Sequence, residues 1–113
     1  MNNIPRFFKK FFAKLAHMNK QLAIRSLTQN KALLSKRFGI TRLALFGSTA
    51  RDSATDKSDI DILVGFDGIA TSKRYFGVQF YLEDLLGCSV DLVTEKALRA
   101  ELRPYIELEA IDV

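Results

Sequence analysis

The sequence predicts one α+β domain with a small mixed β-sheet and helices packed on it. Three apolar runs have the character of strands, at residues 43–46, 60–66 and 90–93. Apolar residues at helical spacing precede, separate and follow these runs, which gives the order helix, strand, strand, helix, strand, helix. The chain has 113 residues with 48% hydrophobic content, enough for one domain with a real but modest core.

Residues 1–17 are predicted to be a basic amphipathic N-terminal extension, and residues 18–113 the domain itself. In the extension, apolar residues recur at helical spacing: Ile4, Phe7, Phe8, Phe11, Phe12 and Leu15. Such a helix docks on a membrane surface or a partner, packs on the domain, or lies outside the functional protein. We expect no membrane association, because a short helix without a second anchor binds lipid weakly.

The net charge of +4 comes from the extension alone. Arg6, Lys9, Lys10 and Lys14 are its charged residues, and basic and acidic residues balance in the rest of the chain. The domain therefore lacks the overall basic charge that nucleic-acid-binding proteins usually have. We expect no direct contact with nucleic acid.

Turn and cap residues delimit the predicted elements. The first helix covers 21–38, with a break near Thr28, and ends at Gly39. A short helix or turn follows Ser48, and a polar loop covers 52–58. A turn at 67–68 follows the second strand, and the next helix runs from a Ser72 cap to Leu86, with Gly87 ending it. After the strand 90–93, Thr94 caps a helical piece that reaches about Leu102, and Pro104 begins another.

Two aspartates alternate with apolar residues at the start of the second predicted strand. Successive side chains of a strand point to opposite faces, so Asp59 and Asp61 share one face while Ile60 and Ile62 face the core. Carboxylates held side by side raise each other's pKa unless a cation lies between them. Mg²⁺ binds through one or two carboxylates together with substrate phosphates. The pair predicts a metal site; the alternative is a solvent-facing edge of the sheet.

A Gly-Ser pair ends the preceding strand, with ten residues between it and the aspartates. Gly47 lets the backbone approach a phosphate, and Ser48 offers a hydroxyl and an N–H group at a predicted helix N-terminus. The alternative for Ser48 is a plain helix cap. Together with the aspartates, this pair predicts a nucleoside triphosphate held by metal. Asp91 in the third strand is the candidate for activating an acceptor hydroxyl, although one acid on a half-exposed strand is ordinary.

The set of motifs resembles the nucleotidyltransferase superfamily that includes DNA polymerase β. Its pattern is Gly47-Ser48, ten residues, Asp59-x-Asp61 and a later strand that carries Asp91. More narrowly, the chain from about Leu22 onward is similar to minimal nucleotidyltransferases that act as antitoxins to HEPN-domain toxins. The likeness includes residues 74–76, 81–87, 90–94 and 102–106. The resemblance implies a polymerase β-like nucleotidyltransferase fold.

The resemblance also implies a role for each matching residue. Asp59, Asp61 and Asp91 would be the catalytic residues and the ligands of two Mg²⁺ ions, with Asp91 as general base. Gly47 and Ser48 would bind the nucleotide, with Ser48 on the β- and γ-phosphates of ATP.

Three further residues are weaker candidates for nucleotide contacts. Arg51 either reaches the triphosphate or is a solvated surface residue, while Lys57 and Ser58 precede the aspartates. Family members often have a glycine directly after this arginine. Asp52 takes that place here, so the geometry of the loop is in question.

The implied activity is transfer of AMP from ATP to a tyrosine of a cognate HEPN ribonuclease toxin, which inactivates the toxin. The chain would be the antitoxin of a type VII toxin–antitoxin system, and a hetero-oligomer with the toxin is compatible with this. Only about twenty residues follow Asp91, so we expect the acceptor to supply much of its own recognition, as a protein does. The single cysteine, Cys88, excludes an internal disulfide and fits a cytoplasmic location.

Two other functions remain open from the sequence. A non-catalytic antidote would neutralise the toxin by binding alone, and the intact set of motif residues argues against it. A nucleotidyltransferase acting on a small molecule or an RNA end is the other alternative, and the balanced charge of the domain argues against that.

Overall fold

The computed structural model describes residues 18–55 and 58–113, so the predicted extension and Lys57 lie outside the described residues. Within them the sheet has the strand order β3-β2-β1-β4. Strand β1 runs antiparallel to both β2 and β4, whereas β2 and β3 are parallel, so the predicted mixed sheet is confirmed. The elements are α2 (Lys20–Phe38), β1 (Ile40–Phe46), α3 (Gly47–Ala50), β2 (Ile60–Phe66), α4 (Ser72–Leu86), β3 (Val90–Thr94), the 3-10 helix η1 (Glu95–Ala97), α5 (Arg103–Glu109) and β4 (Ile111–Asp112).

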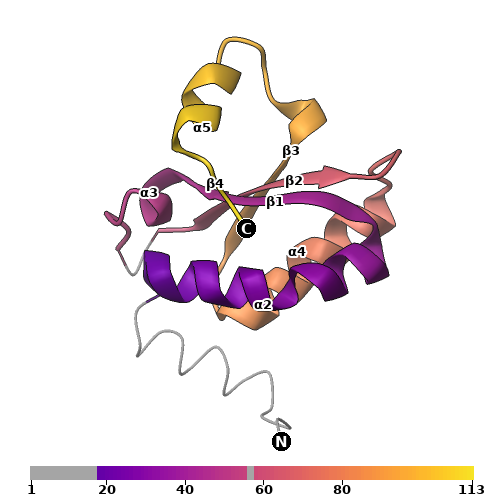
Figure 1. Cartoon of the computed structure of the whole chain (residues 1–113), viewed down its shortest axis with the longest axis horizontal. Helices are drawn as coiled ribbons and strands as arrows, with labels where there is room; N and C mark the ends of the chain where they lie inside the picture. The colour runs from indigo at the N-terminus through magenta and orange to yellow at the C-terminus, as the bar shows by residue number, and fades with distance from the viewer. Residues whose placement is uncertain (1–17, 56–57) are drawn as a thin grey trace, which may run out of the picture.

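Helices α2 and α4 cover one face of the sheet, and η1 and α5 lie over the other (Figure 1). The larger core cluster joins Leu27 and Leu34 of α2 and Leu82 of α4 to Ile60 and Ile62 of β2. A smaller cluster on the second face contains Ala44, Phe46, Leu63 and Leu98. Alternation along β2 therefore puts Ile60 and Ile62 into the main core, as predicted, and leaves Asp61 on the second face together with Leu63.

Glycines end both long helices as predicted, but two cap predictions were wrong. Gly39 and Gly87 adopt the left-handed backbone that terminates α2 and α4. Helix α2 is unbroken at Thr28, whose hydroxyl donates back to the carbonyl of Ile24 instead of capping a second helix. Thr71, rather than Ser72, caps α4, with its side chain accepting from the N–H of Arg74.

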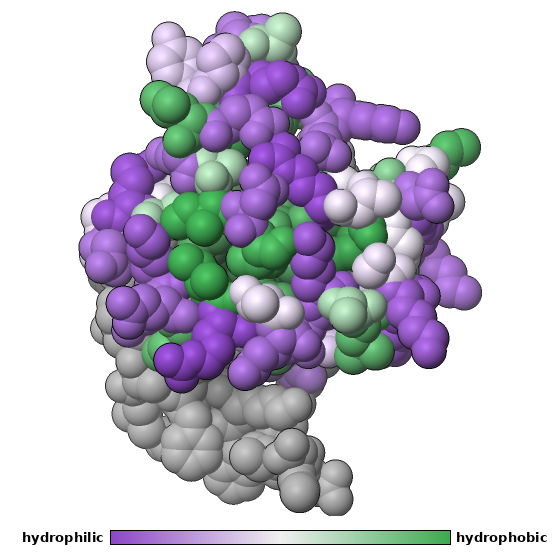
Figure 2. Space-filling view, viewed as in Figure 1, coloured by the Kyte–Doolittle hydropathy of each residue, from purple (hydrophilic) through white to green (hydrophobic). Residues whose placement is uncertain are grey.

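The C-terminal region differs from the prediction in two ways. Thr94 is a cap as expected, but it begins only the short η1 instead of a helical piece reaching Leu102. The end of the chain then forms β4, which was not predicted, by pairing Ile111 with Leu45 of β1. Figure 2 shows hydrophobic side chains gathered over this part of the sheet, between α2 and α5. None of the described helices is both long enough and apolar enough to cross a membrane.

Arg42 connects the C-terminal elements to the second face of the sheet. Its guanidinium forms salt bridges with Glu95 of η1, Glu107 of α5 and Asp112 of β4, at 3.2, 2.8 and 2.7 Å. These bonds join three segments that follow β3 to the middle of the sheet. They hold α5 in the position from which it reaches the Gly-Ser turn.

Candidate active site

The Gly-Ser turn lies directly against the second strand. Phe46, the last residue of β1, is paired with Asp61 of β2, so Gly47 turns away immediately beside that aspartate. Gly47 has a φ of 74°, and a Cβ atom built on it would lie 2.0 Å from Oδ2 of Asp61. Glycine is therefore required here for two reasons, the left-handed backbone and the closeness of the Asp61 carboxylate. The second reason was not foreseen from the sequence.

Ser48 is not the cap of α3. The cap residue is Phe46, which makes no side-chain hydrogen bond to the helix. The carbonyl of Ser48 accepts from the N–H of Ser53 at 2.9 Å, which folds the polar loop back onto the turn. Among the described residues its hydroxyl has no hydrogen-bond partner and is free to bind a ligand. The structure thus removes the plain-cap alternative for this serine.

The three aspartates come from two neighbouring strands. Asp61 and Asp91 are directly paired across the parallel strands β2 and β3, and Asp59 stands one residue before β2. Burial raises the pKa of Asp61 to about 6, and the neighbouring carboxylates of Asp91 and Asp59 add to the rise. The mutual effect expected of closely placed carboxylates is therefore present at Asp61.

These carboxylates fit a metal that takes only part of its coordination shell from protein. In residues 18–55 and 58–113, no group of three or more His, Cys, Asp or Glu side chains is arranged as a metal cage. The aspartates offer oxygen ligands only, and the missing Cβ of Gly47 leaves room around Oδ2 of Asp61. Mg²⁺ suits this arrangement, because it usually keeps several waters and binds one or two carboxylates together with phosphates.

Arg51 is paired with an acidic side chain from α5. It is the C-cap residue of α3, and its Nη1 lies 2.9 Å from Oε2 of Glu109. Its positive charge lowers the pKa of Asp61, opposing the stronger raising effects. The same Glu109 carboxylate also accepts from the N–H of Gly47, so the salt bridge places the Arg51 guanidinium beside the Gly-Ser turn.

Thr55 and Ser58, in the described part of the loop between the turn and β2, bond to each other. The Ser58 hydroxyl accepts from the N–H of Thr55 at 3.0 Å, and the Ser58 N–H donates to the Thr55 carbonyl. Ser58 therefore has a structural role in this conformation. Asp52 stands where the family that this chain resembles often has a glycine. Its φ is 61°, in the left-handed region that glycine adopts more easily.

Glu109, the last residue of α5, is a site residue that the sequence analysis missed. Its Oε1 accepts from the N–H of Gly47 at 3.0 Å, and its Oε2 pairs with Arg51. The contact to Gly47 joins residues 62 positions apart, so no local sequence pattern predicts it.

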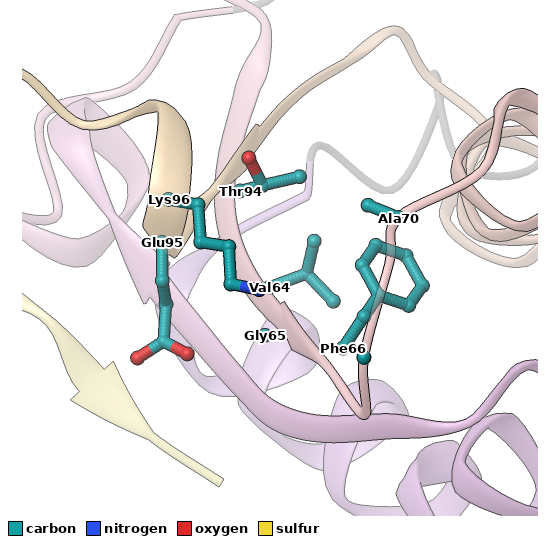
Figure 3. A pocket seen from close by; sticks show the side chains of 8 residues that line it. Val64, Gly65, Phe66, Ala70, Thr94, Glu95 and Lys96 are labelled. Carbon is teal, nitrogen blue, oxygen red and sulfur yellow. The ribbon is translucent and has the colours of Figure 1, made fainter.

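A small cavity elsewhere in the domain is separate from these residues. Its lining includes Val64 and Phe66 at the end of β2, with Thr94, Glu95 and Lys96 around them (Figure 3). Asp61 stands at the other end of β2, three residues before Val64, or about 10 Å along the strand. The cavity is therefore not part of the site built by the aspartates and the Gly-Ser turn.

Comparisons with known proteins identify the family by sequence and by fold. Residues 27–113 match the nucleotidyltransferase domain family. The protein adenylyltransferase MntA of Thermococcus cleftensis is 38% identical over 87 residues, which cover 77% of this chain and 88% of that protein.

Two solved structures share the fold. A minimal nucleotidyltransferase superposes with a TM-score of 0.74 at 36% identity, covering 86% of this chain and 98% of that one. A chain from the complex of a tri-AMPylated Shewanella oneidensis HEPN toxin with its MNT antitoxin has a TM-score of 0.57 at 22% identity, covering 82% and 70%. At that identity the second match concerns the fold alone. By its sequence and its fold, the chain belongs to the nucleotidyltransferase domain family, as a minimal nucleotidyltransferase of the MntA type.

Proposed function

We propose that this chain is an antitoxin that transfers AMP from ATP to a tyrosine of a cognate HEPN-domain ribonuclease toxin and thereby inactivates the toxin. The observation that carries the proposal is the pairing of Asp61 with Asp91 directly beside the Gly47 turn. The relative named protein adenylyltransferase MntA supports the type of reaction. The fold shared with a chain of an AMPylated HEPN toxin complex supports the partner.

In this proposal each site residue has a defined task. Asp59, Asp61 and Asp91 would hold Mg²⁺, and Ser48 and Arg51 would bind the phosphates of ATP next to Gly47. When bound, Mg²⁺ supplies neutralisation of negative charge on the attacking and leaving oxygens. The residues of the turn and the strands contribute mainly by positioning the triphosphate, because little covalent work falls to the protein in such a transfer. Ser58 supports the loop that leads into the aspartates.

Asp91 is exposed, so an incoming hydroxyl can reach it from solvent. It accepts the proton of the tyrosine hydroxyl as the tyrosine oxygen bonds to the α-phosphorus of ATP. The bond between the α-phosphorus and the bridging oxygen of pyrophosphate breaks in the same displacement. The products are AMP-tyrosine and pyrophosphate.

The surface beside the turn suits a protein acceptor. Helix α5, which ends in Glu109, exposes Tyr105 and Leu108 to 73% and 88%, and its N-cap residue Leu102 is 49% exposed. Exposed apolar side chains grouped on one element are typical of a protein-binding surface. ATP as donor and the free thiol of Cys88 fit a reaction in the cytoplasm.

The proposal is tested by intact mass spectrometry of a candidate partner, a HEPN-domain protein to be sought among the products of neighbouring genes, after incubation with the chain, ATP and Mg²⁺. Mass gains in whole AMP units that map to a tyrosine are expected. An Asp59→Asn/Asp61→Asn double variant should produce none. No gain with wild type, together with equally stable complexes of wild type and double variant, would instead identify an antidote that acts by binding. AMP transfer to RNA or a small molecule without the partner would contradict the protein acceptor.

A further inference from the structure

The carboxylate of Glu109 reaches both ends of the short helix that carries Ser48. Oε1 accepts from the N–H of Gly47, the first residue of α3, at 3.0 Å, and Oε2 lies 2.9 Å from Nη1 of Arg51, its C-cap residue. Both groups belong to the predicted phosphate site. The Glu109 side chain therefore contacts both ends of α3, the element between β1 and the loop that leads to the aspartates.

Helix α3 needs such support because it cannot stabilise itself. It has four residues, and its cap residue Phe46 offers no side-chain acceptor. The first N–H groups of a helix have no partner within the helix, and a helix this short gains little from its own hydrogen bonds. Glu109 supplies the acceptor that a capping side chain would otherwise supply.

The backbone next to Glu109 is held in place by hydrogen bonds. It is the last residue of α5, and the next N–H, of Ala110, donates to the carbonyl of Ile106. Ile111 then pairs with Leu45 of β1, two residues before Gly47. The Glu109 side chain is 29% exposed. Its backbone is thus held to the same strand that leads into the Gly-Ser turn, so the distance between the carboxylate and the turn is set by the sheet.

We propose that Glu109 is a positioning residue of the nucleotide site. It fixes the Gly47 turn and the Arg51 guanidinium so that Ser48 and Arg51 present their phosphate-binding groups together beside Asp61. This inference rests on the proposed function, because it assigns Glu109 a part in binding the same ATP. A carboxylate so close to the triphosphate could instead compete with it, and the two roles predict opposite effects of removing Glu109.

The test is the affinity for AMP-PNP with Mg²⁺, measured by isothermal titration calorimetry, which needs no acceptor protein. Glu109→Ala should weaken binding about tenfold, since it removes one charged and one backbone contact. Glu109→Gln keeps an oxygen that accepts from Gly47 but loses the ion pair, so a loss of roughly threefold is expected. Glu101→Ala, which removes an exposed carboxylate of the same C-terminal segment, is the matched control and should bind like wild type.

A second readout follows the contact itself. In ¹H–¹⁵N spectra, the Gly47 amide should lose its hydrogen-bond shift and its exchange protection in Glu109→Ala and keep both in Glu109→Gln. Unchanged or tighter AMP-PNP binding by folded Glu109→Ala would overturn the inference while leaving the proposed function intact. If Glu109→Ala does not fold, Glu109→Gln decides, and wild-type affinity there would overturn the ion-pair role. Wild-type protein that binds no AMP-PNP would overturn the proposed function, and the positioning role with it.

Discussion

Replacing Gly47 with alanine would place a methyl group against the Asp61 carboxylate. The added Cβ would lie 2.0 Å from Oδ2 and 2.8 Å from Cγ of Asp61, far inside ordinary contact distance. The same residue has a φ of 74°, which an alanine adopts with strain. Either the turn or the aspartate must move, and both belong to the candidate site.

The cost has two parts. A left-handed backbone costs a residue other than glycine about 1–2 kcal/mol, and forcing a side chain into a filled space costs about 1–3 kcal/mol. Gly47→Ala should therefore lower the free energy of unfolding by about 2–5 kcal/mol. A displacement of roughly 1 Å at the reacting groups is enough to slow a reaction about a hundredfold, so AMP transfer should fall by at least that factor.

Gly68→Ala is the matched control for this variant. Gly68 has a φ of 80°, but its added Cβ would have nothing within 4 Å, so only the backbone cost applies. Urea unfolding of the two variants should differ by the contact cost of about 1–3 kcal/mol, and Gly68→Ala should keep full AMP transfer. Equal losses of stability in both variants, or normal transfer by Gly47→Ala, would refute the closeness of Gly47 and Asp61 as the reason for the glycine.

Three further predictions concern charge and backbone strain. Without metal, the pKa of Asp61 is raised from 3.8 to about 6, so the folded state binds its proton more tightly than the unfolded chain does. Stability measured by urea unfolding should therefore fall as the pH rises through this window, and Asp61→Asn should lack that slope. Asp52→Gly should raise the unfolding free energy by about 0.5–1 kcal/mol, because it relieves a left-handed φ at some cost in chain entropy; a loss of stability would contradict this. Arg42→Gln should cost about 2 kcal/mol near neutral pH by removing its charged hydrogen bonds. Arg42 lowers the pKa of both Glu107 and Asp112, so the stability it provides is present above their ordinary pKa values and disappears as the pH falls. A cost that stays the same at low pH would contradict this origin.

Local patterns predicted the parts of the fold that local forces determine. The alternation of aspartate and isoleucine predicted which side chains at the start of β2 face the core, because that face of the strand is buried under α2 and α4. Gly39 and Gly87 marked the helix ends because glycine adopts the left-handed backbone conformation at a lower free-energy cost than other residues do. The pairing of Asp61 with Asp91, in contrast, depends on the parallel arrangement of β2 and β3, which was not predicted.

The missed features depend on contacts between distant segments. Strand β4 has two residues, too few for a pattern, and is held by its pairing with β1 and by the bond from Lys31 Nζ to the carbonyl of Val113 at 2.6 Å. Glu109 resembles any other acid on a short helix in the sequence, and only the packing of α5 brings it to Gly47. Its place in the site was therefore visible only in the folded chain.

The site is tested most directly by a crystal structure of the chain grown with AMP-PNP and Mn²⁺, in which anomalous scattering locates the metal. We expect metal peaks at the carboxylate oxygens of Asp59, Asp61 and Asp91, with the triphosphate against Ser48 and the Gly47 turn. Arg51 should contact a phosphate oxygen. Nucleotide bound elsewhere, for example in the cavity near Phe66 and Lys96, or a triphosphate with no metal at these aspartates, would contradict the assignment of the site.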